Sequence, residues 1–326
     1  MIALDLKDRK ILHQLDINCR RSDTVIGKTI GLSSQVIGFR IRRLLKNRIV
    51  QCFYTVIDLA RIGFTSHKNF LRLQNCDRQK ETEIIDFLKS HPNVLWVASC
   101  DGRFDLAFGT WARDVISLNV MLREFQQRYG MLVSERQIAP ILRGEYFVRD
   151  YLIHKEHSVG LRKSFFGGIP TPSDLDLFDW KILHAIGANA RMSAVEVSAR
   201  VGLKPDAIIQ RIRRLEKSGV IRHYNFVPNE SAYPYLHYKV LVGLRNLTNA
   251  RESALMEFCR MNPNIVYICK VLGPWDIEVD MEVETPQNYR DIMMEIKNQF
   301  SDVIKDYSAL QIYQVHKYNF CPSIPK

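Results

Sequence analysis

A cation-rich sequence, R-I-R-R-L, occurs twice in the chain, at residues 40–44 and 211–215. Around the first copy, Ile37, Ile41 and Leu44 recur with the period of a helix, which turns them to one apolar face and the cations away from it. Exposed arginines on a helix can bind phosphates and the edges of guanine bases. The two sequences therefore predict two helices that contact DNA.

The side chains expected at the DNA follow from this helical phase. Gly38 removes bulk from the exposed face, and Gln35 can pair bidentately with adenine. Arg40 and Arg211 fall nearer the apolar face, where an ion pair with Asp8 or Asp179 is as good an interpretation as a DNA contact. The residues predicted to bind DNA are Ser33, Ser34, Gln35, Gly38, Arg42, Arg43 and Lys46 in the first helix, and Lys204, Asp206, Gln210, Arg213, Arg214 and Lys217 in the second.

Positive charge is concentrated around these two helices. The 326 residues carry a net charge of +11, of which residues 18–50 contribute +7 and residues 189–222 contribute +5, whereas residues 224–326 sum to −2. A basic surface indicates an anionic partner, either nucleic acid or an acidic membrane. A basic helix can also be only a solvated face, but its repetition at the same place favours double-stranded DNA.

The chain is one module written twice, at an offset of 171 residues. LDLKDRKILH at 4–13 aligns with LDLFDWKILH at 175–184, and the match continues without a gap to Gly102-x-x-Asp105, which aligns with Gly273-x-x-Asp276. The glycines, prolines and serines between the copies are typical of a linker. The expected domains are 1–52 and 174–223 for DNA binding, 58–152 and 229–322 with alternating strands and helices, and 153–173 for the linker.

Each copy changes its periodicity partway along. Three short helices come first, in the layout of a helix-turn-helix with a Gly-Leu turn before the third. Strand, helix, strand, strand, helix, strand follows, which is the ferredoxin-like order and leaves one face of the sheet uncovered. The predicted class is α+β, with the two sheets packed together as a dimer within one chain.

The order of motifs resembles the Lrp/AsnC (feast/famine) transcriptional regulators. The sequence L-D-x-x-D-x-K-I-L is followed by N-x-R-x-S, by G-L-S in the first copy, by R-I-R-R-L and by G-x-x-D. The resemblance implies DNA-binding heads, a ferredoxin-like effector domain, association of chains into homo-oligomers and a response to amino acids. It does not imply a cofactor, a metal or catalysis.

The resemblance also implies where an amino acid would bind. The loop with G-x-x-D would contribute Ser99, Cys100, Asp101, Gly102 and Asp105 in the first copy, and Gly273 and Asp276 in the second. Glycine lets a charged ligand approach the backbone, and a carboxylate can pair with an amino group. A structural interpretation stays open, because a glycine between two strands is often a turn residue and an aspartate can hydrogen-bond that turn.

The two heads differ where they would contact DNA. Lys204-Pro205-Asp206 stands in the second copy where Ser33-Ser34-Gln35 stands in the first. Asp206 repels phosphate but can accept a hydrogen bond from the amino group of cytosine. Two different half-sites in a fixed order are therefore expected.

Other features narrow the alternatives. The chain has no stretch of 18 uncharged apolar residues and a charged start, so we expect a cytoplasmic protein without membrane segments. His154 and His157 are more consistent with a solvated pair than with a metal site.

Sirohaem decarboxylases resemble the same family in fold, and such an enzyme would need His67, His237 and Arg72 around a tetrapyrrole. The two histidines do not match at the repeat offset, which disfavours this alternative.

Overall fold

The computed structural model describes residues 4–153, 164–187 and 189–322. Each copy begins with three helices that form one head. The bounds are α1 Leu6–Asn18, α2 Asp23–Ile30 and α3 Ser34–Lys46, then α6 Leu177–Gly187, α7 Ala194–Val201 and α8 Pro205–Lys217. Asp5, Ser22 and Ser33 accept hydrogen bonds from the first turns of α1, α2 and α3, and Gly31 ends α2 in the left-handed region at φ 78°.

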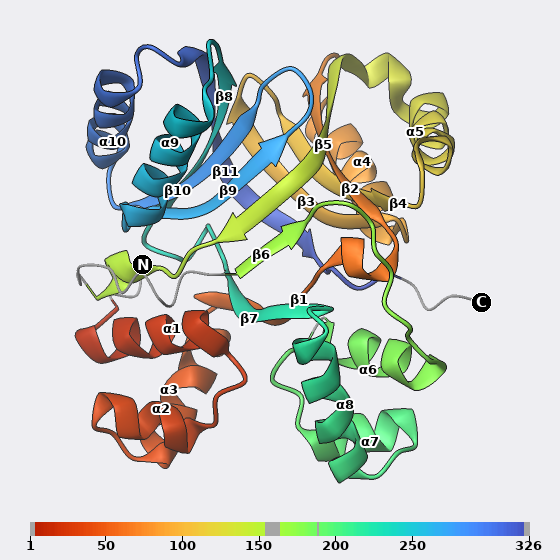
Figure 1. Cartoon of the computed structure of the whole chain (residues 1–326), viewed down its shortest axis with the longest axis vertical. Coiled ribbons are helices and arrows are strands. Elements are labelled where there is room, and N and C mark those ends of the chain that lie inside the picture. Colours follow the sequence, from red (N-terminus) through yellow and green to blue (C-terminus); the bar gives the residue numbers. More distant parts are fainter. Residues whose placement is uncertain (1–3, 154–163, 188, 323–326) are drawn as a thin grey trace.

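A two-stranded ribbon joins the heads to the rest of the molecule. Strand β1, Val50–Ile57, follows α3 directly, and β7, Ile221–Pro228, follows α8. The two strands pair antiparallel with Phe53 opposite Phe226. Both heads therefore lie on the same side of the molecule, below the ribbon (Figure 1).

The remaining elements form two ferredoxin-like units, as predicted. The first contains β2 Thr65–Leu73, α4 Arg78–Ser90, β3 Val94–Gly102, β4 Leu106–Ala112, α5 Val115–Tyr129 and β5 Val133–Tyr146. The second contains β8 Leu236–Leu244, α9 Asn249–Met261, β9 Ile265–Val271, β10 Ile277–Val283, α10 Pro286–Gln299 and β11 Ile304–Tyr318. Short 3-10 helices occur at Leu59–Ile62, Gly130–Leu132 and Asp150–Leu152.

The two sheets are hydrogen-bonded into one closed sheet, which goes beyond the expected face-to-face packing. The last strands, β5 and β11, are long, and each crosses to the other unit. Strand β5 pairs first with β2 and then with β9, while β11 pairs first with β8 and then with β3. The strand order β2-β4-β3-β11-β8-β10-β9-β5 closes through the β2–β5 pairing.

Part of the segment expected to be a linker is a strand. Ser164–Gly167 forms β6 and pairs with the second half of β5. Its Phe166 is buried and stacks on Tyr267 with ring centroids 6.1 Å apart. A buried aromatic side chain therefore anchors a segment whose glycines had indicated only a connection.

Helices cover the outside of this closed sheet. Helices α4 and α5 pack on the first unit around Phe108 and Phe125, and α9 and α10 pack on the second around Met281 and Phe300. A third core lies inside the closed sheet and continues through the ribbon into both heads. In the part of the chain that the structure describes, no helix is both long and apolar enough to cross a membrane.

Gly102 is placed where the two units approach each other closely. Its φ is +126°, and a Cβ atom there would lie 2.5 Å from the carbonyl oxygen of Ala309 on β11. An L side chain at this position would strain the backbone and push the last strand of the second unit away from β3.

We therefore expect Gly102→Ala to lower the free energy of unfolding by roughly 1–3 kcal/mol. Gly202→Ala is the control, because Gly202 also has a positive φ, +81°, but nothing lies within 4 Å of its added Cβ. Urea unfolding followed by circular dichroism measures both. Equal losses in the two variants would show that close approach at Gly102 contributes nothing.

Candidate nucleic-acid interface

The third helix of each head, α3 or α8, is the recognition helix of its helix-turn-helix, and it presents one exposed stripe of four side chains. In α3 the stripe is Gln35, Phe39, Arg42 and Lys46, whose spacing of four, three and four residues keeps them on one helix face. The same positions of α8, at the repeat offset, hold Asp206, Gln210, Arg213 and Lys217, which are also exposed. Most of the side chains predicted to bind DNA are therefore brought together on two matching surfaces.

Gly38 is not on that exposed face. It is buried, and a Cβ atom there would lie 2.8 Å from Oδ2 of Asp23 at the start of α2. The expectation that Gly38 opens space for DNA therefore does not fit its position, because the glycine lets α2 and α3 pack closely. Phe39, which sequence reasoning missed, is 60% exposed instead. An aromatic residue inside an apolar helical pattern looks like core until the neighbouring helices are placed.

Two arginines of α3 bind the first helix of the head. Arg40 Nη1 lies 2.7 Å from Asp5 Oδ2 and 2.8 Å from Asp8 Oδ1. The structural interpretation of Arg40 is therefore confirmed. Arg43 Nη2 also binds Asp8, at 2.6 Å, although Arg43 was expected at the DNA.

The second head repeats this arrangement. Arg211 Nη1 lies 2.8 Å from Asp176 and 2.9 Å from Asp179, and Arg214 binds Asp179 as well. The Asp179 carboxylate is fully buried, so its two arginines neutralise a charge that water cannot reach. Arg214 keeps 56% of its side chain exposed, which leaves its guanidinium accessible to a phosphate.

A second pair of arginines ties the heads to each other. Arg20 Nη1 donates to the carbonyl oxygens of Ala190 and Met192 at 2.5 and 3.0 Å. Arg191, its equivalent in the repeat, donates to the carbonyl oxygens of Cys19 and Arg21 at 2.6 and 3.2 Å. These two cations therefore set the distance between the heads.

The remaining basic side chains are available to phosphates. Within the described residues, ten exposed cations of the two heads have no carboxylate within ion-pair distance, six in the first head and four in the second. They are Lys7, Lys10, Lys28, Arg42, Lys46 and Arg48 in the first, and Arg200, Lys204, Arg213 and Lys217 in the second. The number of cations free to bind phosphate is thus smaller than the total count of arginines and lysines indicates, and the first head has more of them.

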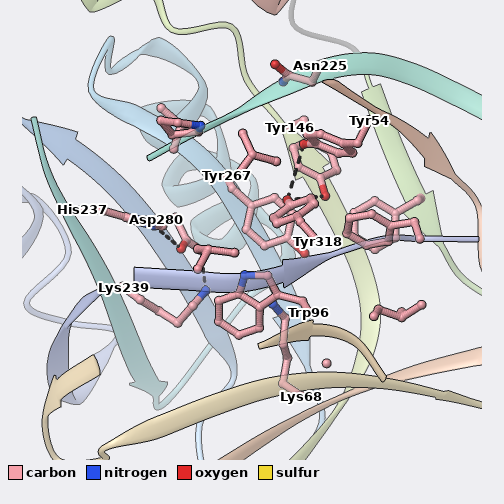
Figure 2. A pocket seen from close by; sticks show the side chains of 18 of the residues that line it. Tyr54, Lys68, Trp96, Tyr146, Asn225, His237, Lys239, Tyr267, Asp280 and Tyr318 are labelled. Carbon is pink, nitrogen blue, oxygen red and sulfur yellow. Dashed lines mark hydrogen bonds and ion pairs between the residues drawn. The ribbon is translucent and has the colours of Figure 1, made fainter. Parts of the chain in front are cut away.

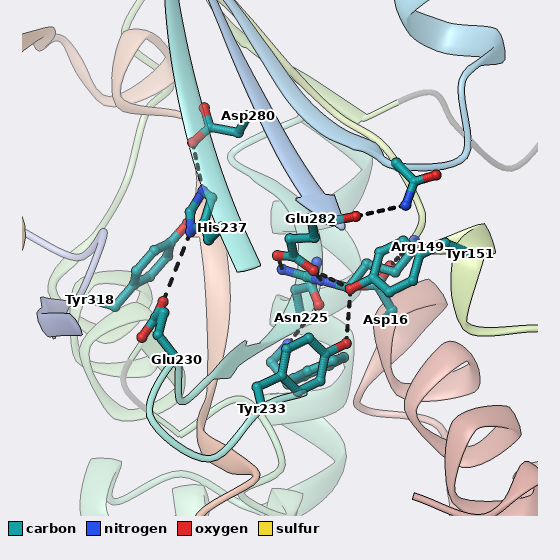
Figure 3. A network of polar contacts seen from close by, with 12 residues as sticks. Asp16, Arg149, Tyr151, Asn225, Glu230, Tyr233, His237, Asp280, Glu282 and Tyr318 are labelled. Carbon is teal, nitrogen blue, oxygen red and sulfur yellow. Dashed lines mark hydrogen bonds and ion pairs between the residues drawn. The ribbon is translucent and has the colours of Figure 1, made fainter. Parts of the chain in front are cut away.

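A buried polar network connects the first head to the closed sheet (Figure 3). Arg149 lies 2.5 Å from Asp16 of α1 and 2.8 Å from Glu282 of β10. Glu282 also accepts a hydrogen bond from the hydroxyl of Tyr151. Since all these groups are largely buried, the orientation of α1 is coupled to β10.

His237, at the other side of this network, is held in its charged form. Burial alone lowers the pKa of its imidazole, but hydrogen bonding to Asp280 at 2.8 Å and the nearby Glu230 carboxylate raise that pKa to about 9. His67, by contrast, has its pKa lowered to about 4 by burial. The two histidines of the decarboxylase alternative are therefore in opposite protonation states at neutral pH. Both line one cavity, whereas Arg72 is exposed and outside that cavity.

The G-x-x-D loops form two hairpin tips. Asp105 accepts a hydrogen bond from the backbone N–H of Leu73 at 2.7 Å, and Asp276 does the same for Leu244 at 2.7 Å. Gly273, like Gly102, lies against the last strand of the other unit, with a Cβ position 3.0 Å from the carbonyl oxygen of Ile138. One oxygen of each aspartate therefore hydrogen-bonds the backbone next to its hairpin tip, and both glycines allow close packing against the other unit. These are the structural roles that the sequence had left as one of two interpretations.

The remaining residues expected at the effector are placed at the first tip. Ser99 Oγ lies 2.9 Å from Nε2 of His316, Cys100 is buried, and Asp101 is exposed. Among the described residues, no cluster of three His, Cys, Asp or Glu side chains could hold a metal ion. His154 and His157 lie outside the described residues.

Both heads match known DNA-binding families. The AsnC-type helix-turn-helix domain matches residues 4–45, and a winged helix-turn-helix DNA-binding family matches residues 175–222. The leucine-responsive regulatory protein of Rhizobium meliloti (strain 1021) is 30% identical over 143 residues, which are 44% of this chain and 92% of that protein. The proline dehydrogenase transcriptional activator of Rhizobium radiobacter is 30% identical over 125 residues, 37% of this chain and 79% of that protein.

The complete chain also has a structural neighbour. The structure of the siroheme decarboxylase NirDL superposes on this chain with a TM-score of 0.61 and 15% sequence identity. The superposition covers 98% of this chain and 95% of the NirDL chain, so the two proteins share a fold. Sequence similarity, in contrast, is to regulators, and each of the two heads matches a DNA-binding model. The chain therefore belongs to the Lrp/AsnC family of DNA-binding transcriptional regulators, in a tandem form with two helix-turn-helix heads.

Proposed function

We propose that this regulator reads an asymmetric operator, in which each head recognises a different half-site. The observation that carries the proposal is the unequal chemistry of the two exposed stripes. Arg42 and Lys46 have the equivalents Arg213 and Lys217, whereas Gln35 and Phe39 are replaced by Asp206 and Gln210. The conserved cations suit phosphates, and the differing side chains suit different bases.

The base preferences follow from hydrogen-bonding capacity. Gln35 can pair with adenine, and the phenyl ring of Phe39 can pack on a thymine methyl group. Asp206 can accept from the amino group of cytosine, and Gln210 can pair with adenine. Because the ribbon and the arginine ties hold the heads together, the half-sites would lie in successive major grooves about one helical turn apart.

We further propose a cytoplasmic regulator that assembles into oligomers and responds to an amino acid. Val115 and Ile116 on α5 are 72% and 71% exposed, and Val120 on the same helix is 66% exposed. Such an apolar face fits contact with another chain. A second chain next to a hairpin tip would complete a cleft around the exposed Asp101.

Catalysis on a tetrapyrrole is the second candidate, because NirDL shares the fold. The cavity offers too little free positive charge for it. Asp280, Glu230 and Glu282 line the cavity, and Arg149, Lys239 and the charged His237 are paired with these acids, so that among the described lining residues Lys68 is the one cation without an acid of its own. A tetrapyrrole with several carboxylates would find a single cation to bind them, so we assign the chain no decarboxylase activity. Anaerobic incubation with sirohaem and measurement of released carbon dioxide tests this, and turnover would contradict the assignment.

The first prediction concerns the phosphate contacts. We expect Arg42→Ala and Lys46→Ala to weaken binding to all DNA sequences, and each to reduce the slope of log affinity against log salt by about 1. Fluorescence anisotropy on the protein's own upstream DNA, titrated through salt, measures the slope. Lys305→Ala, an exposed lysine on β11, is the control and should leave the slope unchanged. An unaltered slope in the helix variants would mean that α3 does not contact the backbone.

The second prediction concerns the order of half-sites. The double variant Gln35→Asp with Phe39→Gln gives α3 the stripe of α8. Selection from random DNA should then yield two equivalent half-sites in inverted orientation where the wild-type protein selects two different ones. The reciprocal variant, Asp206→Gln with Gln210→Phe, should duplicate the other half-site. A selected sequence identical to that of the wild type would contradict the proposal.

A further inference from the structure

A partly enclosed cavity lies inside the closed sheet, on the side of the β1–β7 ribbon that faces away from the heads. It contains about 930 Å³ of space unfilled by protein atoms, its open side included. Both ferredoxin-like units and the ribbon contribute side chains to its lining. Figure 2 shows that Lys68, Lys239, Trp96 and Tyr267 lie close together in this space.

The two lysines are equivalent residues of the repeat, but only one has an acid partner. Lys239 Nζ lies 2.6 Å from Asp280 and 3.3 Å from Glu278, both on the neighbouring strand β10. Asp280 is paired directly opposite Lys239 in the sheet. The second copy thus neutralises its buried cation internally.

The first copy lacks the corresponding acids. Gly109 is paired opposite Lys68, at the repeat position of Asp280, and Ala107 stands at the position of Glu278. Of the described residues, none places a carboxylate within ion-pair distance of Lys68. Its ammonium is instead 4.3 Å from the ring centroid of Trp96 and 5.7 Å from that of Tyr267.

Lys68 is half-buried, and its ammonium has lost part of its water without gaining an acid at ion-pair distance, which is costly. Burial, reinforced by the nearby charge of Lys239, lowers the pKa of Lys68, while the charges of Glu278 and Asp280 act in the opposite direction. The space above Gly109 is open, because a Cβ atom there would have only ordinary contacts, the nearest being 3.6 Å to Cβ of Trp96. The position that Asp280 fills in one copy is therefore available in the other.

We propose that this cavity binds a small organic monocarboxylate, whose carboxylate pairs with Lys68 above Gly109 as Asp280 pairs with Lys239. The site is separate from the G-x-x-D hairpin tips, which contribute nothing to this lining. It uses a charge that the protein itself leaves unmatched.

The rest of the lining selects a flat apolar body for this ligand. Trp96, Tyr267 and Phe166 present aromatic rings, and aromatic faces pack well on planar groups. The hydroxyl of Tyr318 lies 3.4 Å from that of Tyr54 and 3.5 Å from that of Tyr146, so three hydroxyl groups gather at one side. A second anionic group on the ligand would find the other lining cations, Lys239, Arg149 and His237, already paired with acids. An aromatic monocarboxylate satisfies these conditions.

A ligand in the cavity would change the orientation of the heads. Tyr54 of β1 and Asn225, Phe226 and Val227 of β7 line the cavity, and these strands continue directly from α3 and α8. A ligand there contacts the element that sets the orientation of both recognition helices. This regulatory consequence, unlike the binding itself, rests on the proposed DNA-binding function.

The test uses the full chain without DNA. Phenylacetate, benzoate and indole-3-acetate are each titrated to 10 mM while the lysine side-chain signals are followed by NMR, with 2-phenylethanol as the uncharged counterpart of phenylacetate. At least one acid should shift the Lys68 signal saturably, and 2-phenylethanol should leave it unchanged. Lys68→Met removes the cation and identifies its signal.

A second variant removes the site without removing the lysine. Gly109→Asp supplies the carboxylate internally, so it should raise the melting temperature and abolish the response to the acids. Loss of the response in Gly109→Asp, with the Lys68 signal still present, supports the proposal. No saturable Lys68 shift with any of the three acids, or an undiminished shift in Gly109→Asp, would overturn it.

The link to DNA is measured separately. Anisotropy on upstream DNA with and without the acid that binds should show a change in affinity that Gly109→Asp lacks. If the NMR response is present but DNA affinity does not change, the site stands and the coupling to the heads fails. If the protein binds no DNA at all, the proposed function fails and the ligand site is unaffected.

Discussion

The exchange of the two long last strands is the constraint on which the rest of the molecule depends. Because β5 and β11 each pair with a strand of both units, neither ferredoxin-like unit has a free edge where they meet. Closing the sheet creates an interior that contains both a core and a cavity. It also fixes where β1 and β7 must meet, and through them the two heads. A regulator assembled from separate chains would need association to reach this geometry.

Much of this architecture could be predicted because it depends on local signals. Helical and alternating periodicity located the helices and most strand positions, and the offset of 171 residues revealed the repeat. The roles of individual arginines were harder to predict. Arg40 was placed by helical phase, but Arg43 and Arg20 differ from free cations only through partners far away in sequence, Asp8 and the backbone of the other head. Gly38 was misjudged and Phe39 was missed because burial on a short helix depends on how its neighbours cross it.

The unmatched lysine shows what a sequence alone could and could not reveal. The repeat offset aligns Lys68 with Lys239 and Gly109 with Asp280. The meaning of that alignment depends on strand register, which places each lysine directly opposite the residue that differs. Without register, a glycine in place of an aspartate is one substitution among many. With it, the same difference changes a neutralised cation into one that an added anion can stabilise.

The arginine ties between the heads have a consequence for how such a protein can diversify. Arg20 and Arg191 donate to main-chain carbonyl oxygens of the opposite head, which every residue type supplies, and Arg191 binds the Asp23 carboxylate as well. Side chains of one head other than Asp23 can therefore change while the main-chain contacts between the heads are kept. In a homodimer, one mutation changes the DNA contact of both identical heads at once. In this chain the two heads are encoded separately, so one mutation changes the contact of one head. The covalent duplication thus allows one half of a promoter to drift in sequence and be followed by one head alone.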